Sequence, residues 1–190
     1  QVTSFGHPNT SGSKNIDYFI SAKETETNSS DKYYTERLIR FSRLPFNYSK
    51  PKIKKSNFKR KSLDLPENNF LIGIPQSIFK FHPSFDHHLD RITTEIPNAY
   101  LLIIESSKEY ENISLRNRWE ENTKNILKKT IFYPRVNNDD FLGIVNSVDI
   151  MHDTLYFGVG NTFYESMSFG TPMVTMPTSL QRTRNANAGY

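Results

Sequence analysis

The sequence predicts an α/β fold in which helices cover both faces of a parallel sheet. From residue 70 onward, short apolar runs alternate with longer segments whose apolar residues recur every three or four positions. The apolar runs are continuous, as expected of parallel strands that are buried on both faces. We expect strands at 70–74, 100–104, 130–133, 149–151 and 173–176, and helices at 83–95, 115–127, 139–146, 162–169 and from 180 onward.

Individual elements follow from local signals. The helix at 83–95 begins with a proline and places Phe85, Leu89, Ile92 and Ile96 on one face at spacings of three and four. The helix at 162–169 ends at Gly170, and the Thr and Pro after it lead into the next strand. Before residue 69 the pattern is less regular. There we expect strands at 1–6 and 16–20, a loop at 6–14 and a helix at 32–40.

The stretch from 44 to 67 is rich in Lys, Pro, Asn and Ser without a clear period, which predicts a connection between two lobes. Between Lys50 and Lys61 it carries seven basic residues and no acid. Such a run could contact nucleic acid. Phe58 is its only aromatic residue, however, so the stacking residues of a single-strand binder are missing. We favour a solvated loop and expect no nucleic-acid partner.

Composition sets further limits. The 190 residues carry a net charge of +4. They contain no cysteine, which excludes disulfides and cysteine-ligated metals within these 190 residues. No apolar run approaches about 18 residues, so we expect no membrane segment and a cytoplasmic protein. The chain begins with Gln inside an expected strand and ends inside an expected helix, so we expect a fragment of a longer enzyme.

The most informative run lies between residues 149 and 175. A strand ends in a loop with Gly158 and Gly160, and a helix starts at about Asn161 or Thr162. A helix start offers unpaired N–H groups and a positive dipole end, which attract phosphate, and glycines let the backbone come close. Glu165 follows one turn into the helix, within reach of a hydroxylated group such as a ribose. The sequence therefore predicts a nucleotide-sugar pocket.

Glycines and a helix start alone occur in any βαβ unit, but the whole string up to Gly170-Thr-Pro-Met-Val-Thr175 is more specific. It resembles the donor-binding motif of GT-B type glycosyltransferases, in particular the O-linked N-acetylglucosaminyltransferase family with its SPINDLY-like members. Other blocks resemble the same family in the same order. They are Gly6-His-Pro-Asn-Thr-Ser-Gly12 with Asn15-Ile-Asp-Tyr18, Tyr34-Thr-Glu-Arg-Leu38, Lys80-Phe-His-Pro83, and Ile96-Pro-Asn98 with Leu101-Leu-Ile-Ile104.

This resemblance implies a GT-B type fold. Residues 69–190 would be the Rossmann-like donor-binding lobe, 1–45 the tail end of the N-terminal catalytic lobe, and 46–68 the basic connection. It also implies an inverting transfer of a sugar, N-acetylglucosamine first among candidates, from UDP (or GDP) to a hydroxyl acceptor such as a protein Ser or Thr. We expect no cofactor. No Asp-x-Asp motif is present, which argues against a bridging metal, and we interpret Asp86, His87, His88 and Asp90 as a polar helix face.

The resemblance also implies roles for individual residues. Lys80 matches the lysine that contacts the diphosphate, and either Gln76 or Ser77 matches a family glutamine. Thr10, Ser11 and Gly12 would shape the sugar and phosphate side. Val136, Asn138 and Phe141 would lie in the donor site, although members carry a lysine at the position of Asn138 and a histidine at that of Phe141. Gly160 and Asn161 also depart from the family, which leaves the base open between uracil and guanine.

Three candidate segments follow the strands at 70–74, 130–133 and 149–151. Ligands of parallel sheets bind at the carboxyl ends of strands, so we expect one pocket there. His7 is the one titratable group near the expected sugar, and histidine can act as a general base, but many relatives carry a tyrosine there. A different GT-B enzyme, a non-catalytic GT-B module and a basic nucleic-acid binder stay open as alternatives.

Overall fold

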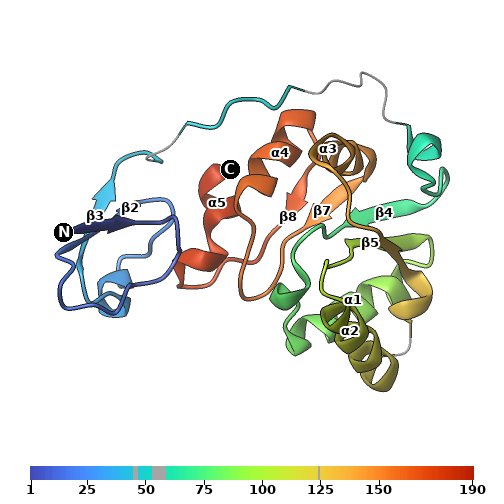
Figure 1. The fold of residues 1–190 in the computed structure, drawn as a ribbon, viewed down its shortest axis with the longest axis horizontal. Helices are drawn as coiled ribbons and strands as arrows, with labels where there is room; N and C mark the ends of the chain where they lie inside the picture. Colours follow the sequence, from blue (N-terminus) through green and yellow to red (C-terminus); the bar gives the residue numbers. More distant parts are fainter. Residues whose placement is uncertain (45–46, 53–58, 124) are drawn as a thin grey trace.

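The computed structural model describes residues 1–44, 47–52, 59–123 and 125–190 (Figure 1). It contains a three-stranded sheet in the N-terminal part and a five-stranded sheet in the rest of the chain. All strand pairings between these residues are parallel. The first sheet has the order β1-β2-β3, with β1 at Val2–Ser4, β2 at Tyr18–Ala22 and β3 at Arg37–Phe41.

The second sheet has the order β6-β5-β4-β7-β8. Its strands are β4 (Phe70–Gly73), β5 (Ala99–Ile104), β6 (Thr130–Tyr133), β7 (Ile150–His152) and β8 (Met173–Val174). The helices are α1 (Pro83–Glu95), α2 (Glu109–Asn122), α3 (Asn138–Ser147), α4 (Asn161–Phe169) and α5 (Asn185–Gly189). Short 3-10 turns occupy Ser30–Tyr33, Arg60–Leu63, Ile78–Lys80, Leu127–Lys129 and Gln181–Thr183.

Helices cover the second sheet on both faces, as the sequence predicts. On one face, Leu101 and Ile103 pack with buried residues of α1 and α2 such as Leu89 and Trp119. On the other face, Leu71 and Leu102 pack with residues of α3, α4 and α5. Figure 1 shows α1 and α2 on one side of this sheet and α3 and α4 on the other. Successive strand residues point to opposite faces, so each continuous apolar run supplies both cores.

Three element predictions are wrong. The helix expected at 32–40 is a 3-10 turn followed by strand β3, because Leu38 is buried opposite Phe19 of β2 and sheet pairing overrides the local pattern. The helix expected at 115–127 spans Glu109–Asn122, with acidic residues in its first turn. The helix expected from 180 is a 3-10 turn and then α5, because the hydroxyl of Thr183 bonds back to Thr178.

The segment around Gln181 joins the two sheets. The side-chain Nε2 of Gln181 donates to the Ser21 hydroxyl at 3.1 Å, and its Oε1 lies 3.3 Å from the Tyr34 hydroxyl. The neighbouring Arg182 donates to Asn9 Oδ1 at 3.4 Å. The C-terminal end of the chain is therefore hydrogen-bonded to β2, to the turn before β3 and to the loop after β1.

The basic stretch lies only partly within the described residues, since Lys54, Lys55 and Phe58 fall outside them. Arg60 is not a solvated side chain. It is half-buried, donates to Ser147 O at 2.8 Å and pairs with Asp149 Oδ2 at 2.6 Å. One of the seven basic residues thus fastens this stretch to the start of β7. No described helix is long and apolar enough to span a bilayer.

Candidate functional site

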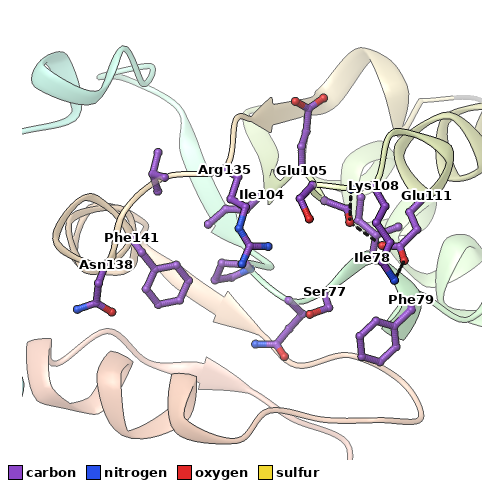
Figure 2. A pocket seen from close by; sticks show the side chains of 15 residues that line it. Ser77, Ile78, Phe79, Ile104, Glu105, Lys108, Glu111, Arg135, Asn138 and Phe141 are labelled. Atoms are coloured by element: carbon purple, nitrogen blue, oxygen red, sulfur yellow. Dashed lines mark hydrogen bonds and ion pairs between the residues drawn. The ribbon is translucent and has the colours of Figure 1, made fainter.

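Two cavities of similar size lie at the carboxyl ends of the strands. The first, of about 460 Å³, is lined by residues that follow β4, β5 and β6 (Figure 2). The second, of about 450 Å³, lies between the loop that precedes α4 and the loop that follows β1, with Asn47 and Tyr48 also in its wall. The segments that follow the strands do meet at this edge of the sheet, but they line two cavities and not the one pocket that we expect from the sequence.

The first cavity brings together five of the predicted site residues: Gln76, Ser77, Val136, Asn138 and Phe141. In Figure 2 Phe141 lies on the side of α3, opposite Ser77 and Phe79 on the segment after β4. The ring of Phe141 offers a flat apolar surface to a planar ligand.

Arg135 also lines the first cavity, and the sequence analysis did not single it out. It is exposed and lies between Phe141 and Ser77 in Figure 2. Its position two residues after the end of β6 was a usable signal, because the other candidate segments also follow strand ends. Its guanidinium adds positive charge that suits an anionic ligand.

Lys80, the last residue of a 3-10 turn, lines the second cavity. Its ammonium donates to Gln76 Oε1 at 2.7 Å and to the carbonyl oxygen of Gly158 at 2.9 Å, and it lies 4.7 Å from the ring centroid of Phe157. Burial lowers the pKa of Lys80, while the charge of Asp153 acts in the opposite direction. An ammonium group has three N–H donors, so these two bonds leave capacity for a ligand.

Lys80 and Gln76 also mark where the two cavities adjoin. Gln76 lines the first cavity and Lys80 the second, and the hydrogen bond between their side chains connects the two walls. Ser77, the other candidate for the family glutamine, is exposed and lines the first cavity only. An elongated ligand that fills both cavities would pass the Lys80 ammonium.

The amino end of α4 forms another wall of the second cavity. Gly160 is the N-cap residue and supplies no side-chain acceptor to the first turn, and Gly160 and Asn161 both line the cavity. The first backbone N–H groups of a helix have no partner within it and carry partial positive charge. An anion in this cavity would therefore meet the helix end on one side and Lys80 on another.

Asp153, which the sequence analysis did not select, holds the loop before α4. It is buried, and its Oδ1 accepts from the backbone N–H groups of Thr154 at 2.9 Å and Val159 at 2.7 Å. Its Oδ2 accepts from the Thr175 hydroxyl at 2.9 Å. Burial raises the pKa of Asp153 despite these bonds. The sequence signal that could have identified Asp153 is its position as an acidic residue directly after a parallel strand.

Gly158 fits the loop because it lacks a side chain. A Cβ there would lie 2.8 Å from Asp153 Oδ2 and 3.2 Å from the carbonyl oxygen of Arg182, to which the Gly158 N–H donates. At Gly160, by contrast, a Cβ would meet nothing within 4 Å. The two predicted glycines thus have different roles, the first in packing and the second at an open cavity wall.

Thr162 and Glu165 line neither cavity. The Glu165 carboxylate is hydrogen-bonded by the side chains of Tyr48 and Thr162, and burial raises its pKa. Tyr48 stacks on Tyr164 with ring centroids 5.2 Å apart. The ribose contact proposed for Glu165 remains a prediction, and Tyr48 is a partner that the sequence did not indicate.

Thr10, Ser11 and Gly12 are also outside the two cavities, and their polar groups are already in use. The hydroxyl of Thr10 donates to Glu36 Oε2 at 2.6 Å, the N–H of Ser11 donates to Oε1 at 2.8 Å, and the Ser11 hydroxyl also bonds Oε1. Burial opposes ionisation of Glu36, but these bonds outweigh it and hold its pKa at about 2. The Gly12 N–H bonds back to Thr10, and its φ of 69° favours glycine.

His7 is exposed, and its side chain is not part of the cavity wall. Its neighbours Gly6 and Pro8 do line the second cavity, together with Phe5. The loop after β1 therefore reaches the cavity, as the sequence predicts, but with its apolar residues and backbone.

The cluster at 86–90 is not a plain polar face. Asp86 is buried and pairs with Arg118 at 2.7 Å, and His88 Nε2 lies 3.1 Å from Nε2 of the buried His152. Burial lowers the pKa of His152. Within the described ranges, no group of three or more His, Cys, Asp or Glu side chains is placed to hold a metal ion.

No protein-family model matches the chain. Over 99% of its length it is 23% identical to the Arabidopsis thaliana protein named "Probable UDP-N-acetylglucosamine--peptide N-acetylglucosaminyltransferase SEC", of which it covers 20%. An O-GlcNAc transferase mutant of Thermobaculum terrenum matches 99% of this chain with a TM-score of 0.79 and 22% identity, over 35% of its own length. WaaG, a glycosyltransferase involved in lipopolysaccharide biosynthesis, matches 87% of the chain with a TM-score of 0.53 and 14% identity, over 45% of its length.

These likenesses confirm the predicted fold and the predicted resemblance. The chain has the α/β, GT-B type architecture and is similar to O-GlcNAc transferases over nearly its whole length. It spans a fifth of the plant relative and about a third of the bacterial transferase.

Proposed function

We propose that this chain is part of a glycosyltransferase that moves N-acetylglucosamine from UDP to a hydroxyl group, most simply a Ser or Thr of a protein. The observation that carries the proposal is the position of Lys80. Its ammonium is held by Gln76 and the Gly158 carbonyl, at the junction of two cavities and opposite the uncapped end of α4. Fixed positive groups at this place suit a diphosphate leaving group.

In this proposal the nucleoside occupies the first cavity and the sugar the second. The base lies against the Phe141 ring, with Arg135, Val136 and Asn138 around it. The diphosphate passes Lys80 and the N–H groups at the start of α4. The sugar then faces Phe5, Gly6 and Pro8 from the loop after β1. UDP is preferred over GDP on the similarity to the plant protein, whose name specifies UDP-N-acetylglucosamine.

The proposed reaction is an inverting displacement. The acceptor oxygen attacks the anomeric carbon from the face opposite the nucleotide, the bond from that carbon to the diphosphate oxygen breaks, and the hydroxyl proton goes to a base. Negative charge grows on the diphosphate, where Lys80 and the helix end stabilise it. We propose no metal and no cofactor. His7 would serve as the base only if the loop after β1 turned its side chain into the second cavity.

Calorimetric titration of UDP and of GDP into the protein tests the proposal. We expect saturable UDP binding that Lys80→Met weakens by roughly 1.5–3 kcal/mol, the range for a hydrogen bond to a charged group. Lys128→Met is the matched control, because Lys128 is exposed and precedes β6, away from the carboxyl ends of the strands. Equal UDP affinity in Lys80→Met and the control would remove Lys80 from the site.

The lowered pKa of Lys80 gives a second readout. Because burial lowers that pKa, the ammonium loses its proton at a lower pH than an exposed lysine does. UDP affinity should therefore fall on the alkaline side in the native protein, and Lys80→Met should lose this pH dependence. Transfer of radiolabelled sugar to a Ser/Thr peptide then separates an enzyme from a non-catalytic binding module.

A further inference from the structure

A third and smaller cavity lies where the three-stranded sheet meets the segment after β8. It measures about 180 Å³, and its wall includes Pro8, Asn9, Glu26, Tyr33, Tyr34 and Gln181. Thr10 also lines it, with its hydroxyl bonded to Glu36, and Pro8 is shared with the second cavity; the other wall residues have no part in the proposed donor site. A water molecule takes about 30 Å³ in the liquid, so the cavity has room for a group of several non-hydrogen atoms.

Glu26 is the unusual member of this wall. Its side chain is only 6% exposed, and its Oε1 accepts hydrogen bonds from the Ser21 hydroxyl at 2.7 Å and the Tyr34 hydroxyl at 2.8 Å. Its Oε2 is buried and has no hydrogen-bond partner among the described residues. A buried carboxylate oxygen without a donor is costly, so this atom indicates a missing partner that carries N–H or O–H groups.

One cation near Glu26 is already paired elsewhere. Arg40, the nearby cation, donates twice to Asp31, at 3.2 Å and 2.5 Å, and once to the carbonyl oxygen of Thr27 at 3.3 Å. No ion pair among the described residues involves Glu26. The missing partner is therefore best supplied by a positively charged group from outside.

Two tyrosines make an ammonium group the best fit. The faces of aromatic rings attract cations, and the Nζ of the exposed Lys32 already lies 5.0 Å from the centroid of the Tyr33 ring. Glu26 is the single carboxylate among the residues that line this cavity, whereas divalent metal ions take several oxygen ligands. A buried carboxylate beside aromatic rings is suited to an alkylammonium.

We propose that this cavity binds an alkylammonium group, and that its occupant is a lysine side chain of the acceptor polypeptide. The ammonium donates to Glu26 Oε2, and the alkyl stem lies against Pro8 and the tyrosine rings. Pro8 lines this cavity and also the second cavity, so the occupant lies next to the expected sugar. The assignment to an acceptor rests on the proposed function, whereas the ammonium site does not.

The first experiment titrates n-butylammonium chloride into the whole chain and follows backbone amide shifts of Tyr33, Tyr34 and Gln181 by NMR. The uncharged n-butanol is the matched ligand. We expect saturable shifts with butylammonium and at least tenfold weaker binding of butanol. Equal binding of the two, or no shift at these residues, would overturn the ammonium site.

Glu26→Gln tests the residue. The amide keeps an acceptor for Ser21 and Tyr34 but loses the charge, so we expect butylammonium affinity to fall at least tenfold. Glu24→Gln is the control, because Glu24 is an exposed acid two residues away. Melting curves show whether Glu26→Gln stays folded. If it does not, Tyr33→Leu is used, for which we expect a several-fold loss of butylammonium affinity. Unchanged butylammonium affinity in the folded variant would contradict the proposal.

A second ligand separates a lysine side chain from a free small amine. Nα-acetyl-lysine amide should bind with the same Glu26 dependence as butylammonium, and its norleucine counterpart should not. If only butylammonium binds, the acceptor assignment is wrong and a small-amine site remains. UDP titrations on the same samples keep the two proposals distinguishable, because Glu26→Gln should leave UDP affinity unchanged.

Discussion

Two loops of this molecule look alike in sequence but differ in what they leave available. Residues 10–12 and 158–161 are both short glycine-containing segments, and the sequence predicts that both contact the donor. In the first, the polar groups of Thr10 and Ser11 are bound to Glu36. In the second, the start of α4 has no side-chain cap and borders a cavity. Hydrogen-bond capacity that the fold has not already used is what distinguishes a candidate ligand site.

The largest effect is expected from disturbing the support of the second loop. Gly158→Ala would place a methyl group 2.8 Å from Asp153 Oδ2 and 3.2 Å from a backbone carbonyl. We expect a loss of about 1–3 kcal/mol in the free energy of unfolding, measured by urea denaturation. Gly160→Ala, with open space around the new methyl group, should cost much less. Equal losses in the two variants would show that Asp153 does not fix the loop.

A change at the loop of residues 10–12 should lower the stability of the protein without lowering its ligand affinity. Glu36→Gln removes the charge that accepts from Thr10 and Ser11, and we expect a loss of about 1–2 kcal/mol in the free energy of unfolding at neutral pH. UDP affinity should stay within a factor of two. A tenfold loss of UDP affinity in a folded variant would return Thr10, Ser11 and Gly12 to the donor site.

Low pH should destabilise the protein for the same reason that Glu36→Gln does. The pKa of Glu36 is about 2 in the folded protein against an ordinary value of 4.5. A lowered carboxyl pKa contributes stability that is present above pH 4.5 and is lost as pH falls toward 2. Melting temperatures across this range should fall less steeply in Glu36→Gln than in the native protein.

The smallest effect is expected in the first cavity, where we propose that the base of the donor lies. Phe141→Leu removes the flat ring from the first cavity but keeps an apolar side chain at this position of α3. We expect UDP affinity to fall by about 1 kcal/mol and stability to change little. An unchanged affinity in calorimetry would mean that the base does not stack on this residue.

Sequence reasoning succeeded where the pattern reports local chemistry. The continuous apolar runs at 70–74 and 100–104 predicted buried strands, which the structure has at 70–73 and 99–104, and Gly158 with Asn161 marked the start of α4. It failed for β3, whose strand conformation depends on pairing with β2 and not on its own residues. The location of the cavities followed from the rule that parallel strands bind ligands at their carboxyl ends.

The side-chain partners could not be predicted. Lys80 meets the Gly158 carbonyl across 78 residues of sequence, and Thr10 meets Glu36 across 26. Nothing in either local segment specifies such a partner. Asp153 and Arg135 could have been found by extending the strand-end rule to each polar residue that follows a strand. The role of Tyr48 beside Glu165 depends on the course of the connection and had no local signal.

The parallel pairing of the described strands has a consequence for how the molecule folds. A parallel pair cannot form through a tight hairpin, since each strand must wait for a crossover connection. Ile72 of β4 pairs with Ile150 of β7, and β7 leads directly into the loop that precedes α4. Sheets with such distant pairings fold slowly. We therefore expect the amino end of α4 to be completed late in folding, after residues 70–73 have paired with 150–152. An early intermediate would then contain helices but not the cavity.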